Sequence, residues 1–482
     1  MPKDRCVRAR GGLVERHSID FVPAGERHGR PSSLFALWFA ANLQISAVVT
    51  GSLAVVFGLD ALWSVVALLA GNLLGGAVMA LHAAQGPRLG LPQMISSRAQ
   101  FGVRGAAVPL VCSIVMYIGF FASGSVLAGQ AVGHLAHTGE TAGIVVFALA
   151  TAVTAAVGYR LIHRVGRLAA AVGALAFVYL GVQLVRSAPL GVILGEHHFS
   201  APLFLLAMSL SASWQLGFGP YVADSSRYLP RDTRPGAVFG ATMGGSVLGA
   251  QWSMGFGALA AAWHGGGEGD EVGNIVGMGG SAAITLLLYF AIAFGKLTVN
   301  VLNTYGGFMS IVTGVSGFRR IRPVGPLARS LYVGGIMLAG TTLALLGRGN
   351  FLESFSTFLL CLLTFFTPWS AINLVDFYLL SKEGYDIEAL ADPGGRYGAW
   401  NVRALTTYAA GILVQLPFLS TELYTGPLVA RLGGADVSWI VGLALPALMY
   451  GLLARRGPGR RPRGKDDALG SGVPAPAELR SR

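Results

Sequence analysis

The stretch AIAFGKLTVNVLNTYGG, residues 291–307, carries a lysine in the middle of an apolar tract that runs from about residue 281 to residue 312. Lys296 is the tract's one charged residue, and the nearest strong charges, Glu271 and Arg319, lie well outside it. A lysine at the centre of a membrane helix costs about 2.5–3.5 kcal/mol on insertion scales. The tract therefore predicts a membrane span whose lysine is functional or specifically paired.

Composition extends this interpretation to the whole chain. The 482 residues are 53% hydrophobic and only 12% charged, whereas soluble domains average about 25% charged. Repeated long apolar runs predict an all-α polytopic membrane protein with twelve transmembrane helices, numbered spans 1–12 in chain order. The spans are, approximately, 34–58, 61–83, 106–131, 143–159, 168–185, 201–222, 236–262, 281–312, 328–347, 354–380, 403–421 and 437–454. The first thirty residues are polar and basic, unlike a cleavable signal peptide.

The distribution of positive charge predicts the orientation. Most of the 35 Lys and Arg residues lie in the termini or in the loops on the same side of the membrane as the termini. The four exceptions are Arg186, Arg348, Arg431 and Lys296. Such a bias places those loops and both termini in the cytoplasm, which fits an inner-membrane protein with an even number of spans. The basic stretch RRGPGRRPRGK is accordingly interpreted as a membrane-facing tail, and no nucleic-acid partner is expected.

Sequence patterns for enzymatic chemistry are absent. The three cysteines, Cys6, Cys112 and Cys361, lack metal-ligand spacing, and no HExxH, GxSxG or P-loop pattern occurs. We therefore expect neither an enzyme nor a cofactor or metal. A membrane-embedded enzyme is kept as the alternative from another class, although no intramembrane carboxylate pair supports it. A channel is a third class, and nothing in the sequence is similar to a selectivity filter.

Span 8 carries polar side chains on one face. Lys296, Asn300 and Asn303 are spaced i, i+4, i+7, so they share a stripe of an otherwise apolar helix. An asparagine amide offers both donors and an acceptor, which suits a ligand edge that presents both. The alternative is that the asparagines only hydrogen-bond neighbouring helices.

Span 6 contains a predicted interruption. In SASWQLGFGPYVADSSRYLP, residues 211–230, two glycines and a proline fall within 217–220. Glycine and proline cost about 1 and 3 kcal/mol in a helix interior, so an unwound segment is predicted. Broken spans mark substrate sites in secondary transporters. Trp214, with Ser213 and Gln215 beside it, is either a stacking wall for a flat ligand or core packing.

Two further spans have features of a ligand site. In span 3, VMYIGFFASGS places Tyr117 and Phe120 on one face, although an aromatic stripe alone is more typical of packing. In span 1, WFAANLQISAVVTGS places Asn42 and Gln44 deep in an apolar run. Span 1 has no proline, so a break there is less evident from the sequence.

Five separated motifs then resemble one family. They are ERHSIDFVPAGERHGRPSSLFALWFAANL before and within span 1, GPRLGLPQMISSRAQFGVRGA between spans 2 and 3, PYVADSSRYLP after span 6, VNVLNTYGGFMS in span 8 and TPWSAINLVDFYLLSKEGYDIEAL after span 10. In this order, over roughly residues 15–420, they resemble the nucleobase–cation symporter family, purine–cytosine permease type.

The resemblance implies a leucine-transporter-like fold: a five-plus-five inverted repeat with spans 1 and 6 broken, plus two peripheral helices. The chain is then divided as 1–33, a basic cytoplasmic segment; 34–380, the transport core, with repeats 34–185 and 201–380; 381–402, a cytoplasmic loop; 403–454, the peripheral helices; and 455–482, a basic tail expected to be disordered.

The resemblance also implies a site for one flat heterocycle at the membrane centre. Trp214 looks like the stacking aromatic of span 6, Phe120 falls where many members have a tryptophan, and Tyr117 falls at a polar position of the same face. Asn300 and Asn303 look like amides that read the ligand's edge. The expected substrate-binding residues are Trp214, Phe120, Asn303, Asn300, Tyr117, Ser213, Phe218 and Asn42.

The cation site departs from the family's sodium-coupled members, which hold sodium with paired hydroxyls on span 8 and carbonyls of span 1. Here GKLTVN provides Thr298 as one hydroxyl, with Leu297 as its neighbour. We predict that the Lys296 ammonium occupies the sodium position and that H⁺ couples transport rather than Na⁺. The alternative is a carboxylate partner, for which Asp376 is the candidate within a span.

The resulting hypothesis is a secondary transporter that imports cytosine or a purine by alternating access, in which a bundle of spans 1, 2, 6 and 7 rocks against a scaffold. The alternative substrates are allantoin, hydantoin and a hydroxymethylpyrimidine. The expected partners are the nucleobase and the lipid bilayer, with no obligate protein partner.

Overall fold

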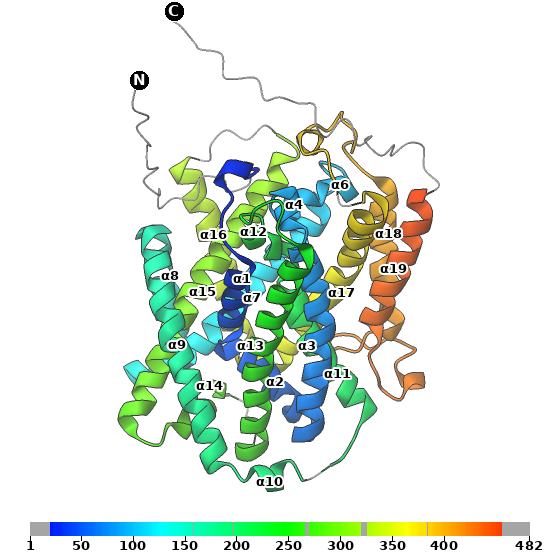
Figure 1. The fold of residues 1–482 in the computed structure, drawn as a ribbon. Helices are drawn as coiled ribbons and strands as arrows, with labels where there is room; N and C mark the ends of the chain where they lie inside the picture. Colours follow the sequence, from blue (N-terminus) through cyan, green and yellow to red (C-terminus); the bar gives the residue numbers. More distant parts are fainter. Residues whose placement is uncertain are drawn as a thin grey trace, which may run out of the picture.

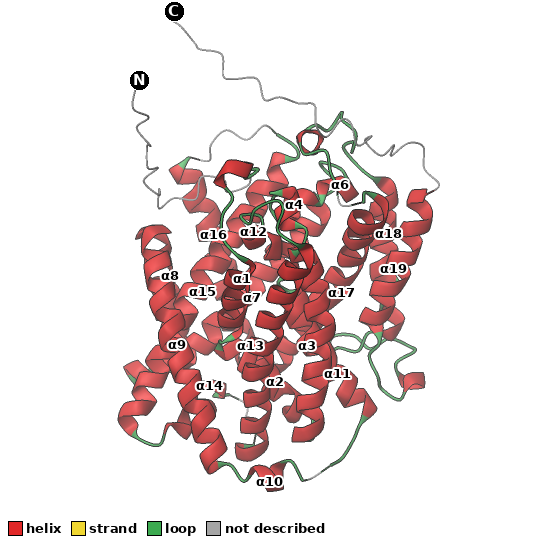
Figure 2. Ribbon diagram, viewed as in Figure 1, coloured by secondary structure: helices red, strands yellow, loops and turns green. Residues whose placement is uncertain are grey.

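The computed structural model describes residues 20–157, 159–195, 197–265, 269–319, 325–382 and 384–455. Within these ranges the chain forms helices and connecting loops but no strand (Figures 1 and 2). The all-α class is thus confirmed. Most of the predicted N-terminal segment and the basic tail from residue 456 lie outside the described residues.

The helices follow the predicted spans in order. The first half comprises α1 (Pro31–Asn42), α2 (Ile45–Val56), α3 (Ala61–Ala83), α4 (Gly86–Leu89), α5 (Gln93–Ser96), α6 (Arg98–Phe101), α7 (Ala107–Ala136), α8 (Glu140–Val157), α9 (Tyr159–Ser187) and α10 (Leu190–Ile193). The second half comprises α11 (Ala201–Leu216), α12 (Val222–Ser226), α13 (Pro235–His264), α14 (Glu271–Val276), α15 (Ala282–Ser316), α16 (Pro326–Gly347), α17 (Phe351–Leu374), α18 (Val402–Leu413) and α19 (Ser438–Arg455). The π-helical turn Val375–Leu380 continues α17.

The number of membrane crossings stays a prediction. In the described residues, five helical stretches are long and apolar enough to cross a membrane, and the bent pair α1–α2 makes a sixth. Span 11 is shorter than predicted, because α18 ends at Leu413 and a 3-10 turn follows at Leu416–Phe418. Pro417 explains the difference, since it lacks an amide donor and disfavours helix in the residue before it.

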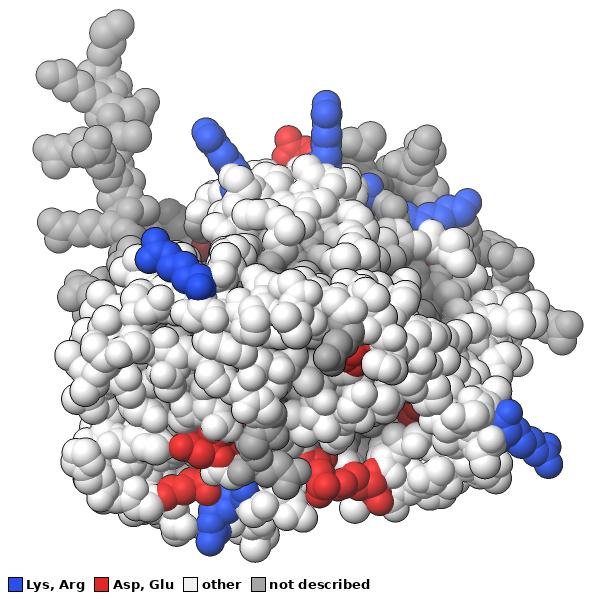
Figure 3. Space-filling model, turned by 90° about the horizontal axis from the view of Figure 1, so that it is seen from below, with Lys and Arg blue, Asp and Glu red and all other residues white. Residues whose placement is uncertain are grey.

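The helices form one bundle in which α8 and α9 lie at one edge and α18 and α19 at the other (Figure 1). The first described residues and the end of α19 lie at the same face, together with the short helices α4 and α12, as an even number of crossings requires. The opposite face carries α10 and α14, and Figure 3 shows only scattered charged side chains there. The division into two repeats stays a prediction.

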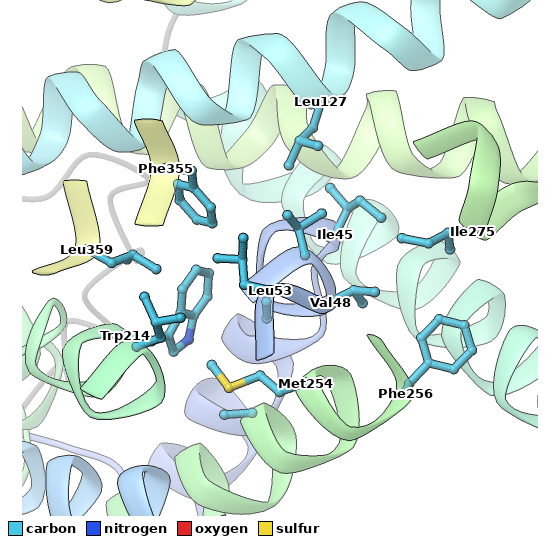
Figure 4. Close-up of a cluster of buried hydrophobic side chains, with 14 of the residues drawn as sticks. Ile45, Val48, Leu53, Leu127, Trp214, Met254, Phe256, Ile275, Phe355 and Leu359 are labelled. Carbon is cyan, nitrogen blue, oxygen red and sulfur yellow. The ribbon is translucent and has the colours of Figure 1, made fainter. Parts of the chain in front are cut away.

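The hydrophobic core is centred on α2 (Figure 4). Ile45, Val48 and Leu53 of this helix are buried. They pack in one cluster with side chains from α7, α11, α13, α14 and α17. These include Leu127, Trp214, Met254, Phe256, Ile275, Phe355 and Leu359.

Two glycines let α2 and α13 approach closely. A Cβ added to Gly51 would lie 1.9 Å from the Met254 carbonyl oxygen, and one added to Gly257 would lie 1.9 Å from the Val48 carbonyl oxygen. Small residues at such crossings let membrane helices pack backbone against backbone. The crossing fixes the second half of span 1 to span 7.

We predict that Gly257→Ala destabilises the protein by about 1–3 kcal/mol, the usual cost of overpacking a core. Its thermal unfolding temperature in detergent should fall. Gly240→Ala on the same helix is the matched control, because nothing lies within 4 Å of its added Cβ. Equal unfolding temperatures for the two variants would contradict the close crossing.

Candidate functional site

Span 1 is broken between α1 and α2. The two helices are bent by 60°, and the chain at the bend exposes backbone carbonyls that a continuous helix would satisfy. Ser253 Oγ donates to the Asn42 carbonyl at 2.8 Å, and Gln44 Nε2 donates to the Ala41 carbonyl at 2.8 Å. These side chains explain how a break forms without proline or glycine.

Lys296 binds to this break. Its side chain is 3% exposed. The Nζ atom donates to Gln44 Oε1 at 3.0 Å and to Ser46 Oγ at 2.5 Å. No carboxylate pairs with it among the described residues. Asp376, the alternative partner, instead accepts a hydrogen bond from the Tyr450 hydroxyl at 2.6 Å. The lysine of α15 therefore connects to the start of α2.

Thr298 does not reach toward α2 in this structure. Its hydroxyl donates to the Gly295 carbonyl of its own helix at 2.8 Å. Thr298 nevertheless lines the cavity described below, as Lys296 does.

Span 6 is interrupted where glycine and proline predict it. α11 ends at Leu216, a 3-10 turn follows at Gly219–Tyr221, and α12 continues from Val222. The interruption is milder than at span 1, because the chain continues as tight helical turns rather than opening into a loop. It places Phe218 and Tyr221 toward the neighbouring helices α1 and α7.

A cavity of about 790 Å³ lies between α1, α9, the interrupted span 6 and α15. Pockets for small ligands typically have volumes of 300–1,000 Å³. The walls are mostly apolar and carry a few polar side chains. The aromatic and polar lining includes Trp38, Tyr117, Phe218, Tyr221, Gln44, Lys296, Thr298 and Asn303.

The aromatic lining forms a connected wall. Ring centroids lie 5.2 Å apart for Trp38 and Phe218, and 6.0 Å apart for Phe218 and Tyr221. Tyr117 and Tyr221 are 5.6 Å apart with their planes inclined by 33°. Such a wall offers flat faces to an aromatic ligand.

The cavity includes some of the predicted site residues and omits others. Tyr117, Phe218, Asn303, Lys296 and Thr298 line it. Trp214, Phe120, Asn300, Ser213 and Asn42 lie outside its lining. Trp38 and Tyr221 line it without having been predicted. Two features of the sequence could have indicated these residues. Trp38 is one helical turn before Asn42, and Tyr221 directly follows the proline of the interruption.

Trp214 and Asn42 belong to a buried hydrogen-bond network. Trp214 Nε1 donates to Asn42 Oδ1 at 2.7 Å, and Asn42 Nδ2 donates to Ser246 Oγ at 3.1 Å. Ser246 Oγ donates to Gln215 Oε1 at 2.6 Å, and Gln215 Nε2 donates to Asn72 Oδ1 at 3.0 Å. The network joins α1, α3, α11 and α13. These helices form spans 1, 2, 6 and 7, which the sequence predicts to move as one bundle.

Phe120 and Ser213 also make contacts within the protein. Phe120 packs edge-on against Trp214 and Phe358, with centroids 5.8 and 5.2 Å apart. The Ser213 hydroxyl donates to the Leu359 carbonyl of α17. In this structure both residues pack helices together beside the cavity.

The two asparagines of α15 have different surroundings. Asn300 Nδ2 donates to the Phe121 carbonyl at 3.0 Å and to Ser125 Oγ at 3.0 Å, and so connects α15 to α7. Asn303 Nδ2 is buried and has no hydrogen-bond partner among the described residues. A buried donor without a partner costs about 1–3 kcal/mol. Asn300 Oδ1 also lacks a partner within the described part of the chain, but of the two residues only Asn303 lines the cavity.

Sequence comparisons identify relatives along almost the whole chain. Residues 21–442 match the family described as "Permease for cytosine/purines, uracil, thiamine, allantoin". The Bacillus subtilis protein named "Putative purine-cytosine permease YxlA" is 38% identical over 445 residues, which cover 92% of this chain and 96% of that protein. "Purine-cytosine permease fcyB" of Emericella nidulans is 24% identical over 461 residues, which cover 91% of this chain and 87% of that protein.

Solved structures share the fold. The inward-facing conformation of Mhp1 superposes with a TM-score of 0.73 at 20% identity, covering 92% of this chain and 94% of that one. A second structure is that of Mhp1, a nucleobase-cation-symport-1 family transporter, in a closed conformation with bromovinylhydantoin bound. It superposes with a TM-score of 0.69 at 20% identity, covering 92% of this chain and 96% of that one. These similarities confirm the predicted leucine-transporter-like fold class.

We predict that Trp214→Phe lowers the thermal stability of the purified protein. The change keeps a ring but removes the indole donor, so Asn42 Oδ1 loses this hydrogen bond inside the bundle. Leaving a buried acceptor unpaired costs about 1–3 kcal/mol. Trp252→Phe, at a tryptophan that is 48% exposed on α13, serves as the control.

Ligand affinity measured on the same samples distinguishes the two roles considered for Trp214. We expect Trp214→Phe to change the affinity only a few-fold. Unchanged stability together with a tenfold loss of affinity would contradict the network role and favour direct stacking on the ligand.

Proposed function

Because the chain belongs to the nucleobase–cation symporter family, purine–cytosine permease type, we propose that it imports cytosine or a purine by alternating access. Its relatives are permeases, so the protein is a transporter rather than an enzyme. The observation that supports this proposal most is one cavity that combines an aromatic wall, an unpartnered asparagine amide and a buried lysine.

The base would stack on the face of Tyr117 or Tyr221, whose planes are inclined by 33°, and Phe218, at 82° to Tyr221, would border the stack. Stacking of a base on aromatic side chains contributes about 1–3 kcal/mol. The Asn303 amide would donate to an acceptor on the edge of the base, and rotation of the amide would let it read either donors or acceptors. We assign no base contact to Trp214, Phe120, Asn300, Ser213 or Asn42, because they lie outside the cavity lining.

The moving part would be the bundle of α1–α2, α3, α11–α12 and α13. The hydrogen-bond network through Asn42, Ser246 and Asn72 joins these helices inside the membrane, where separating polar groups is costly. Asn300 connects α15 to α7 outside the bundle. Lys296 lies on α15 and binds Gln44 and Ser46 of the bundle, so its hydrogen bonds cross the interface that must slide.

Lys296 would take the role that a coupling cation has in sodium-dependent relatives. Its ammonium has three donors, two of which bind the break of span 1. Lysine is also the cation whose protonation responds readily to burial. A proton gained on one side and released on the other would strengthen and weaken the contact with the break. We therefore propose H⁺ rather than Na⁺ as the coupling ion.

The proposed location is the inner membrane with both termini cytoplasmic. The charge bias of the loops supports it, as does the position of both described chain ends at one face (Figure 1). Allantoin and hydantoin remain the second candidate substrates, because the family description includes allantoin and Mhp1 was solved with bromovinylhydantoin bound.

We predict that Asn303→Leu lowers the affinity for the preferred base about tenfold, because a ligand acceptor loses its buried donor. Inhibition of labelled cytosine uptake by adenine, guanine, hypoxanthine, uracil, allantoin and hydantoin measures the effect and ranks the substrates. Analogues that lack the bonded group should be affected least. Asn300→Leu is the control and should lower stability without changing the ranking. An equal loss for every analogue with Asn303→Leu would make Asn303 a packing residue.

We predict that Lys296→Met abolishes accumulation of substrate against a gradient. Lys296→Arg should not restore it, because a guanidinium stays charged and cannot release the proton. Uptake into proteoliposomes with imposed gradients measures this. In native protein, an inward proton gradient should drive uptake and a sodium gradient should not. Strong stimulation by sodium without any response to pH would contradict the coupling role of Lys296.

A further inference from the structure

Tyr117 lies directly against the backbone of α15. A Cβ added to Gly306 would lie 2.4 Å from both Cε1 and Cζ of the Tyr117 ring and 2.9 Å from its hydroxyl oxygen. Carbon atoms rest about 3.5–4.0 Å apart, so no residue with a side chain fits there unless the ring moves by about 1 Å or more. The ring of Tyr221, the last residue of the 3-10 turn before α12, lies 5.6 Å away between centroids. The Tyr117 ring is therefore confined between α15 and this turn.

This contact is part of the cavity wall. Gly306 and Tyr117 both line the cavity, and Gly306 follows Asn303 by about one helical turn. The Tyr117 side chain is 9% exposed, and its hydroxyl makes no hydrogen bond among the described residues. The position of the ring is thus set by packing, and the ring packs directly against Gly306.

We infer that Gly306 is a positioning residue that fixes Tyr117 beside Asn303 and thereby sets the width of the base site. The inference rests on the proposed function, since it names the feature that decides which base fits. A methyl group at residue 306 pushes the ring away from α15 and toward the ligand space. A bicyclic purine extends further in its ring plane than cytosine does and so covers more of the displaced ring, and purines therefore lose more affinity.

The test measures equilibrium binding of labelled adenine and cytosine to purified protein, together with the KM and maximal rate of uptake. Gly306→Ala should lower adenine affinity about tenfold and cytosine affinity less, with the maximal rate little changed. Gly314→Ala, on the same helix but with nothing within 4 Å of its added Cβ, is the control. Equal binding by the Gly306→Ala and Gly314→Ala variants would overturn the inference.

The same substitution made in Tyr117→Ala protein distinguishes a positioning role of Gly306 from a direct effect of the added methyl group on the ligand. In Tyr117→Ala protein, adding Gly306→Ala should change affinity less than twofold, because no ring remains to be displaced. A tenfold loss that persists in this background would overturn the inference. If Gly306→Ala alone does not fold, its recovery on adding Tyr117→Ala supports the conflict between ring and methyl, and failure to recover contradicts it. Native protein that binds no nucleobase would instead overturn the proposed function itself.

Discussion

The hydrogen bonds from Lys296 to Gln44 and Ser46 are the contact on which the rest of the site depends. A buried ammonium and a broken helix are each costly in a membrane, because neither finds water there. Here the side chains of Gln44 and Ser46 give the ammonium its oxygen acceptors, and Ser253 satisfies the Asn42 carbonyl at the end of α1. The contact also sets the edge of the cavity, since Gln44 and Lys296 both line it.

A second constraint, the network from Trp214 through Asn42 to Asn72, determines what surrounds that contact. It joins the helices that the Lys296 contact links to α15. Other polar contacts, such as the bond from Ser213 to the Leu359 carbonyl, connect the same bundle to α17. Polar groups in a membrane interior thereby divide into two kinds. Those paired within a helix group hold it together, and those that face the cavity or cross the sliding interface remain available for binding and coupling.

Much of the fold could be predicted from the sequence, because long apolar tracts and the single lysine of span 8 are local signals. The interruption of span 6 was predictable for the same reason, since its glycines and proline lie in the segment itself. The break of span 1 was less evident, because its partners are distant in the chain: Ser253 donates to the Asn42 carbonyl and Lys296 donates to the Gln44 side chain. Asn300 and Asn303 share a helix face, yet only the structure shows that Asn300 Nδ2 is paired with α7 and that Asn303 Nδ2 lacks a partner among the described residues.

In the proposed mechanism, the protonation of Lys296 and the binding of substrate are coupled. Coupling between two ligands is reciprocal, so binding of the base must then change the number of bound protons. Titration calorimetry of purified protein in buffers of different ionisation enthalpy measures that number. We expect a binding enthalpy that varies with the buffer for native protein, does not vary for Lys296→Met, and is insensitive to sodium. A native enthalpy independent of the buffer across the neutral pH range, with an affinity that rises with sodium, would contradict the proposed mechanism.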